Sequence, residues 1–208
     1  MKRLFNGCSL PVLGLAAMLA GCAAPPADHF YTLAGGATAS SAPAPVPPAG
    51  AGTMYVEMLA VNVPAQVQRN QLVVAGAGEG RVEVLDQHRW AGPLADEIGG
   101  ALSLGVTSRL GAIDVYRTPA PDGAAVYRIS TSVQRFESVP GSHALIDAVW
   151  SVRLVGSAAV LTCRSVLREE AGAGYEAVVA AHRAALGKLA EAIAGAVRNR
   201  QGNGPAGC

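Results

Sequence analysis

The four residues Leu19-Ala20-Gly21-Cys22 have the types and the order that a bacterial lipoprotein cleavage site requires. They end an uncharged hydrophobic run, residues 10–20, which follows two basic residues near the N-terminus, as in a secretory signal peptide. This run is shorter than the roughly 20 apolar residues that span a bilayer. We therefore expect cleavage between Gly21 and Cys22 to remove residues 1–21, and acyl groups such as palmitate to be attached to the thiol and the amine of Cys22.

The residue after Cys22 bears on the destination of the mature chain. In bacteria that sort lipoproteins, an Asp at this position commonly keeps the protein in the inner membrane, whereas this sequence has Ala23. We therefore expect an anchor in the outer membrane, on its periplasmic face. Several acyl chains hold firmly, because each buried methylene contributes about 0.8 kcal/mol. The alternative is an ordinary secretory signal in which Cys22 is incidental.

No residue pattern in the sequence indicates catalysis, a cofactor or a metal site. The four histidines are scattered without an HExxH pair or other regular ligand spacing: His29, His88, His143 and His182. The sequence also lacks the GxSxG motif of hydrolases. The glycines of residues 76–80 fail the GxGxxG spacing and separate two strand-like segments, which favours a β-hairpin over a phosphate-binding loop. We interpret three single carboxylates as solvated charges: Asp86, Glu97 and Asp147.

Two cysteines remain in the body of the mature chain. Cys163 lies within a predicted strand, and Cys208 ends a glycine-rich tail. An oxidising compartment permits them to pair, but the sequence does not give the Cα separation that a disulfide requires. We interpret Cys163 as a small buried hydrophobic residue, and the sequence assigns no role to Cys208.

Two polar segments are candidates for partner binding. The first is the connection at residues 64–70, which contains Arg69, and the second contains Arg89 and Trp90. Arg and Trp are enriched at the hot spots of protein interfaces. The alternative is that Trp90 serves only to anchor a helix to the sheet.

Composition divides the chain into four parts. Residues 1–21 are the signal peptide. Residues 22–52 form a lipidated N-terminus and a flexible Ala/Pro-rich linker, with a short strand near residues 29–33, because most of this segment is too poor in large apolar side chains to offset its ordering entropy. Residues 53–200 form a single domain, and residues 201–208 a disordered tail. The formal net charge of +1 gives no indication of a nucleic-acid partner.

Hydrophobic periodicity predicts the first half of the domain. A strand is expected over residues 55–63, and a hairpin from residues 71–75 and 81–85. A helix is expected over residues 90–110, because apolar side chains recur every four residues along one face: Trp90, Leu94, Ile98, Leu102 and Val106.

The second half reads as three strands and a closing helix. The apolar and polar alternation that starts at Tyr127 slips before Phe136, which predicts a β-bulge. The glycine turn at residues 156–157 predicts that the last two strands are antiparallel. A closing helix is expected over residues 174–200. The order of elements predicts an α+β fold, with a mainly antiparallel (mixed) β-sheet and two long helices packed on one face.

Several of these segments resemble the PqiC-like lipoproteins, the auxiliary lipoproteins of ABC-type and MCE-protein transport systems. The resemblance covers residues 30–198 and is carried by four segments: Tyr31-Thr32-Leu33, Val63-Pro64, Arg69-Asn70-Gln71-Leu72-Val73 and Arg89-Trp90-Ala91-Gly92-Pro93-Leu94. Members of the family often have Arg-Trp-Ala-Glu-Pro-Leu in the last segment. Here Gly92 replaces the acidic residue, and Asn70 stands where a proline is common.

The resemblance implies an outer-membrane-anchored periplasmic subunit of an intermembrane lipid transport system. Its protein partner would be an MCE-domain protein of the inner membrane, its acyl anchor would contact outer-membrane lipid, and self-association into a homo-oligomer would suit the role. The implied role is docking, without catalysis. The alternatives are a general outer-membrane lipoprotein that scaffolds or assembles other envelope proteins, and a periplasmic hydrolase.

Overall fold

The computed structural model describes residues 27–35, 52–202 and 207–208. The signal peptide, the cleavage site at Gly21 and Cys22, most of the linker at residues 36–51 and the tail residues 203–206 lie outside these described residues. In the described residues the elements form two sheets and two helices, which confirms the expected α+β class. The strands are divided between a five-stranded and a three-stranded sheet.

The larger sheet has the order β5-β2-β6-β7-β8. Its strands are β2 (Met54–Met58), β5 (Ala112–Asp114), β6 (Val126–Val139), β7 (His143–Leu154) and β8 (Val160–Glu170). β6, β7 and β8 pair antiparallel, whereas β2 pairs parallel with both β5 and β6. The sheet is therefore mixed, with the long antiparallel strands at one side.

The long strands show the alternation of apolar and polar residues that the sequence predicts. The pairing of β6 with β7 shifts register between Val133 and Arg135, which confirms the β-bulge expected before Phe136. β7 and β8 are joined through a turn in which Gly156 has φ of 87°, and they pair antiparallel as expected. The inward side chains of β6 and β7, among them Ile129, Ile146 and Trp150, are almost fully buried.

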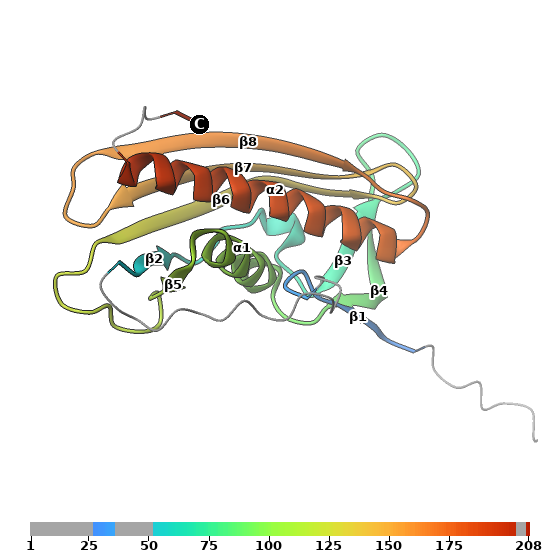
Figure 1. The fold of residues 1–208 in the computed structure, drawn as a ribbon. Helices are drawn as coiled ribbons and strands as arrows, with labels where there is room; N and C mark the ends of the chain where they lie inside the picture. The colour runs from blue at the N-terminus through green and yellow to red at the C-terminus, as the bar shows by residue number, and fades with distance from the viewer. Residues whose placement is uncertain (1–26, 36–51, 203–206) are drawn as a thin grey trace, which may run out of the picture.

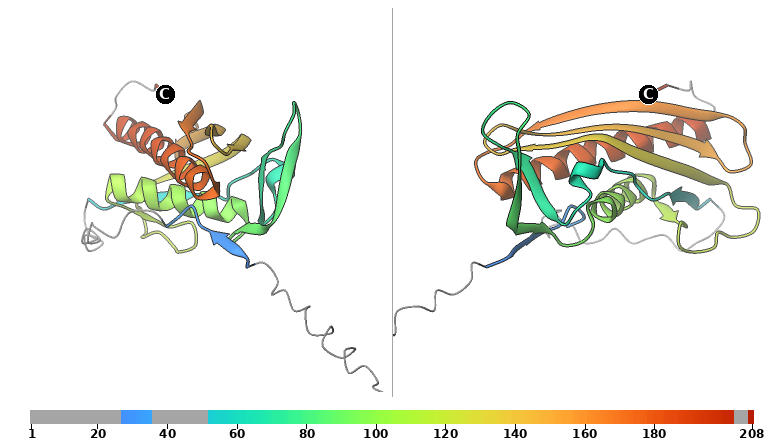
Figure 2. Two further views of the ribbon diagram at one scale, coloured as in Figure 1. Left: turned by 90° about the vertical axis from the view of Figure 1, so that its right-hand side faces the viewer. Right: turned by 180° about the vertical axis from the view of Figure 1, so that it is seen from behind.

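Two helices cover one face of the five-stranded sheet (Figures 1 and 2). They are α1 (Leu94–Leu110) and α2 (Tyr175–Gln201). α1 ends where Gly111 adopts the left-handed conformation, with φ of 60°. α1 and α2 approach closely at Gly105, since a Cβ atom added there would lie 2.8 Å from the Cβ of Ala190. The absence of a side chain at Gly105 allows the two helices to make contact. The buried apolar side chains of both helices belong to one hydrophobic core.

The smaller sheet lies at one end of the molecule (Figures 1 and 2). Its order is β1-β4-β3, with β1 (His29–Tyr31), β3 (Gln71–Ala75) and β4 (Val82–Trp90). β3 and β4 form the expected hairpin, whereas β1 pairs parallel with the last three residues of β4. The expected short strand near residues 29–33 is thus present, and it is docked on the domain before the linker begins.

Two expectations about boundaries are wrong. The segment from His88 to Trp90 is a strand end, and α1 starts four residues later than Trp90. Pro93 is the N-cap of α1. Its ψ of 134° is extended, as is typical of the residue that precedes the first turn of a helix. The expected strand over residues 55–63 ends at Met58, after which only Asn62 forms an isolated bridge, to Ser132.

The end of the chain is attached to the five-stranded sheet. Gln201 is the last residue of α2, and Cys208 forms a disulfide with Cys163 of β8, with a Cα–Cα distance of 5.7 Å. Cys163 is buried, as expected, but as one half of a disulfide. The pairing crosses a separation of 45 residues and closes a loop that contains all of α2.

Candidate functional site

Trp90, one of the three candidate binding residues, is a core residue. Its side chain is only 3% exposed, and its ring lies edge-on to Phe136 of β6, with the centroids 6.1 Å apart. Its backbone N–H donates to the carbonyl of Asn70 at 2.6 Å, which holds the start of β3 against the end of β4. Trp90 therefore joins the small sheet to the large one, and a partner cannot reach its ring in this structure.

Arg69 and Arg89, the other two candidates, lie at the same end of the small sheet. Arg69 is exposed, whereas Arg89 is half-buried. Arg89 is the register partner of Gln71, which stands two residues after Arg69. The Arg89 Nε donates to the carbonyl of Asp86 at 2.9 Å, and one of its Nη atoms lies 4.0 Å from a carboxylate oxygen of Asp28. The backbone pairing thus places both arginines at one end of the small sheet, and Trp90 lies in the core.

Beside this corner, aromatic and titratable side chains hold β1 to the start of α2. The Tyr31 hydroxyl donates to a carboxylate oxygen of Glu176 at 3.1 Å and lies 2.8 Å from Nδ1 of His88. The His88 ring stacks on His29, with centroids 4.9 Å apart, and contacts the ring of Tyr175 at 4.3 Å. We call these five residues the β1 clasp.

The clasp shifts the titration of two of its members. Burial, and then the hydrogen bond and negative charge of Glu176, raise the pKa of Tyr31 to about 12. Hydrogen bonds from the Glu176 backbone N–H and, to a smaller extent, from the Tyr31 hydroxyl lower the pKa of the Glu176 carboxyl. At neutral pH the pair is therefore a neutral phenol that donates to a carboxylate, which is a positioning arrangement.

Charged groups of both helices fix the residues that follow β1. A single carboxylate oxygen of Glu97 on α1 accepts from the Thr32 hydroxyl and from the Leu33 N–H, each at 2.7 Å. Arg183 on α2 donates from Nε and Nη2 to the Thr32 carbonyl, at 2.9 and 2.6 Å. Glu97, expected as a solvated charge, is thus a structural acceptor. The sequence predicts a short strand near residues 29–33, but it does not predict these contacts with the two helices.

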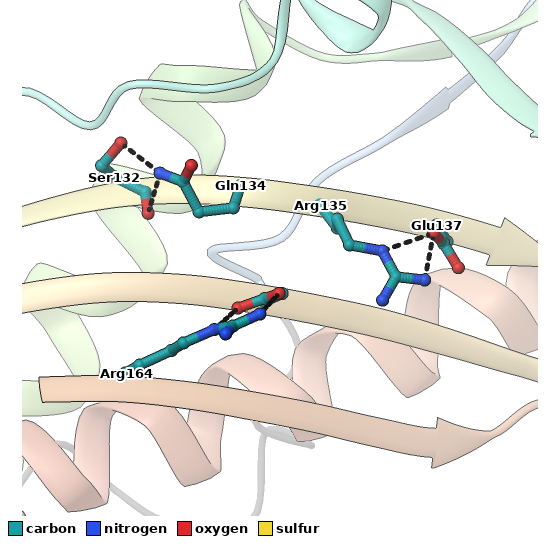
Figure 3. Close-up of polar contacts among 6 residues, drawn as sticks. Ser132, Gln134, Arg135, Glu137 and Arg164 are labelled. Atoms are coloured by element: carbon teal, nitrogen blue, oxygen red, sulfur yellow. Dashed lines mark hydrogen bonds and ion pairs between the residues drawn. The ribbon is translucent and has the colours of Figure 1, made fainter.

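Polar side chains of β6, β7 and β8 form contacts on the face of the large sheet that points away from the helices (Figure 3). There Arg164 forms a two-point ion pair with Asp147, at 2.9 and 2.6 Å, and Arg135 pairs with Glu137. Asp147 was expected to be solvated, but its side chain is 1% exposed, because the guanidinium covers it. The hydrogen bonds from Arg164 lower the pKa of the Asp147 carboxyl.

One histidine lies wholly within the core. His182 on the apolar stripe of α2 stacks on Phe136, with centroids 3.9 Å apart, and its Nε2 lies 2.9 Å from the Ser138 hydroxyl. Burial, and to a smaller extent the charge of His143, lowers the pKa of His182 to about 3. It is therefore neutral at physiological pH, and it is closed off from any substrate.

Within residues 27–35, 52–202 and 207–208, no three His, Cys, Asp or Glu side chains gather as metal ligands would. Neither of the helices in that part of the chain combines the length and the apolar character that crossing a bilayer requires.

Comparison with known proteins gives a family and a fold. The family model described as "ABC-type transport auxiliary lipoprotein component" matches residues 31–194. No curated protein matches the chain. A crystal structure of an uncharacterized protein is similar, with a TM-score of 0.61 and 16% identity over 81% of this chain and 97% of that one.

A crystal structure of a protein from Xanthomonas campestris is also similar, with a TM-score of 0.51 and 18% identity. The similarity covers 69% of this chain and 81% of the Xanthomonas chain. At these identities the solved structures support the fold alone. The range that the family model matches begins at Tyr31, the last residue of β1, and ends within α2. It includes both candidate arginines and every residue of the β1 clasp except His29.

Proposed function

Because this chain belongs to the family of ABC-type transport auxiliary lipoprotein components, we propose that it is the outer-membrane-anchored docking subunit of an intermembrane lipid transport system. Its partner in this proposal is an MCE-domain protein of the inner membrane. The family match over residues 31–194 carries the proposal, since it spans both sheets and both helices. The family's auxiliary role points to a function without catalysis.

The proposed anchor is Cys22, exposed as the first residue by cleavage after Gly21. The sequence before it supports signal cleavage, and Ala23 supports sorting to the outer membrane. The acyl chains would place the folded domain in the periplasm, at the inner surface of the outer membrane. From there it can meet a partner that reaches across from the inner membrane.

The proposed protein contacts are Arg69 and Arg89. Arg69 is exposed and Arg89 is half-buried. The backbone bond between Trp90 and Asn70 fixes the start of β3, which follows Arg69, against the end of β4, which carries Arg89. Long arginine side chains on a rigid support suit recognition of carboxylates on a partner. Trp90 contributes to this site by packing on Phe136 beneath it.

Binding of the lipidated protein to the purified MCE partner in detergent tests this proposal. We expect Arg69→Glu with Arg89→Glu to weaken binding at least about tenfold, which corresponds to about 1.4 kcal/mol. Arg117→Glu is the matched control, because Arg117 is an exposed arginine in the loop after β5, outside the small sheet. Equal binding by all three proteins would reject the arginine contacts.

The broader role is tested in cells. Deletion of the gene should increase envelope permeability as much as deletion of the MCE partner, because both act in one transport system. A protein that scaffolds other envelope components would instead give a defect without any association with the MCE protein. Unchanged permeability together with no binding above a non-lipidated control would reject the transport function.

A further inference from the structure

We propose that the exposed face of β1, centred on Phe30, rests against the lipid headgroup layer of the membrane that holds the acyl chains. This inference rests on the proposed acylation of Cys22 and adds a second lipid contact to it. Phe30 is 63% exposed, the largest value among the large hydrophobic side chains of the described residues. It lies in a three-residue strand at the edge of the small sheet.

The length of chain before β1 limits how far this face can move from the membrane. Cys22 stands five positions before Ala27, the first described residue. Five residues span at most about 18 Å when fully extended. The long Ala/Pro-rich segment adds nothing to this reach, because it follows β1 in the chain. It connects two docked parts of the domain, and only residues 22–27 separate the anchor from the fold.

β1 is firmly attached to the domain, so the short tether also sets the orientation of the domain. The strand pairs with β4 from His29 to Tyr31, and the N–H of Ala91 donates to the Tyr31 carbonyl at 2.7 Å. Glu97 and Arg183 then hold Thr32 from both helices. A pull on the anchor is therefore transmitted to both sheets and both helices, and the β1 end of the molecule faces the bilayer.

The chemistry around Phe30 favours lipid as the occupant of this face. Its register partner is Arg89, whose guanidinium lies 4.0 Å from the Asp28 carboxylate, so the charge beside the ring is largely balanced. Side chains such as Phe, Trp and Leu form the apolar faces of segments that lie in the headgroup region of a bilayer. Among the described residues, Phe30 is the exposed large hydrophobic side chain that stands nearest to Cys22 in the sequence.

A fluorescent thiol label at Phe30→Cys, in full lipidated protein reconstituted into vesicles of phosphatidylethanolamine and phosphatidylglycerol, tests the contact. The label site is selective, because Cys163 and Cys208 are paired and Cys22 is acylated in the proposed mature protein. Val160→Cys is the matched control. Val160 is 51% exposed and begins β8 at the opposite end of the molecule. The Cys22→Ser protein without acyl chains gives the solvent-exposed reference for both labels.

We expect the vesicles to protect the label at position 30 from aqueous iodide and to leave the label at position 160 as accessible as in the reference. Equal accessibility at both positions would overturn the proposal, as would equal protection at both. Protection at position 30 that arises only when the MCE protein is added would also overturn it, and would assign Phe30 to a protein contact. The first experiment contains no partner protein, so its failure is distinguishable from failure of the proposed docking function.

Discussion

Arg89 and Trp90 are neighbours in the chain, but they point to opposite sides of β4. One side chain reaches solvent beside Asp28, and the other packs against Phe136 in the core. Successive side chains of a strand point to opposite faces, so Arg89 lies at the surface while Trp90 anchors the same strand in the core. Substitution of Trp90 should therefore reduce stability, whereas substitution of Arg89 should reduce binding without a large change in stability.

Trp90→Ala should lower the free energy of unfolding by about 3–5 kcal/mol, because it removes a buried indole between the two sheets. Arg89→Glu should change stability by no more than about 0.5 kcal/mol, because Arg89 is a half-buried surface side chain whose ion pair with Asp28 is long, at 4.0 Å. Urea denaturation of both variants, monitored by circular dichroism, measures the difference. Comparable losses in the two variants would show that Arg89 is part of the core support.

His182 should make the fold sensitive to mild acid. Its pKa in the folded protein is about 3, below the unfolded value of 6.5, so below pH 6.5 the unfolded chain binds the additional proton. The contribution is fully present above pH 6.5 and is lost as the pH falls toward 3. Between pH 7 and pH 5 the loss from this one group is about 2 kcal/mol.

The test compares denaturant midpoints at pH 7 and pH 5 in the wild type and in His182→Gln. The variant is expected to be less stable than the wild type at pH 7, but its stability should fall less between pH 7 and pH 5. Partial burial and Arg168 also lower the pKa of His143, so a residual slope is expected in the variant. Asp147 contributes only at lower pH, because its carboxyl already has a pKa below 3.8. Identical slopes in both proteins would contradict the role of His182.

At the scale of the elements, the contact between α1 and α2 depends on Gly105. Gly105→Ala should destabilise the protein by about 1–3 kcal/mol, because the new Cβ would lie 2.8 Å from that of Ala190. Gly99→Ala is the matched control on the same helix. Its Cβ would meet Val61 at 3.7 Å, an ordinary contact, so it should gain up to about 1 kcal/mol from helix propensity. Thermal unfolding that ranks the variants in the opposite order would reject this account.

The disulfide should stabilise the pairing of α2 with the sheet. Closing a loop of 45 residues corresponds to about 4 kcal/mol in the unfolded-chain entropy model. Cys208→Ser should therefore lower the unfolding free energy by about that amount under oxidising conditions. In the presence of dithiothreitol the wild type and the variant should have the same stability. A difference that persists under reducing conditions would assign the effect to another cause.

The elements also show what the sequence can and cannot predict. Long periodic segments such as α2 and β7 were predicted within a residue or two, because burial of one face imposes a clear period. The start of α1 was misplaced because Trp90 lies four residues before Leu94, a spacing that fits a helix and that a buried strand end reproduces by chance. The bulge before Phe136 was found because a slip of phase leaves a visible trace in the alternation.

At the scale of the whole molecule, contacts between distant segments were the part that could not be predicted. The parallel docking of β1 on β4, the division into two sheets and the pairing of Cys163 with Cys208 all depend on tertiary geometry. The prediction that Asp147 is a solvated charge is wrong, because its ion pair with Arg164 forms across two strands that only the tertiary structure pairs. The folded unit thus extends beyond residues 53–200, to the β1 segment and to Cys208.

The arrangement of the whole molecule follows from where the anchor joins the fold. A short tether leads into β1, and β1 is held by β4 and both helices, so the small sheet is the part of the domain nearest the membrane in our proposal. Arg69 and Arg89 lie at this end. A partner that spans the periplasm would therefore meet these arginines at the membrane surface, where lipid must be transferred.

Site-specific photo-cross-linking in cells tests the central claim most directly. A photoreactive residue replaces Arg69 in the otherwise native lipoprotein, and Arg117 in the control. The account predicts an adduct with the MCE-domain protein from position 69 and none from position 117. Absence of that adduct from correctly exported and lipidated protein, or equal adducts from both positions, would contradict the proposed docking role.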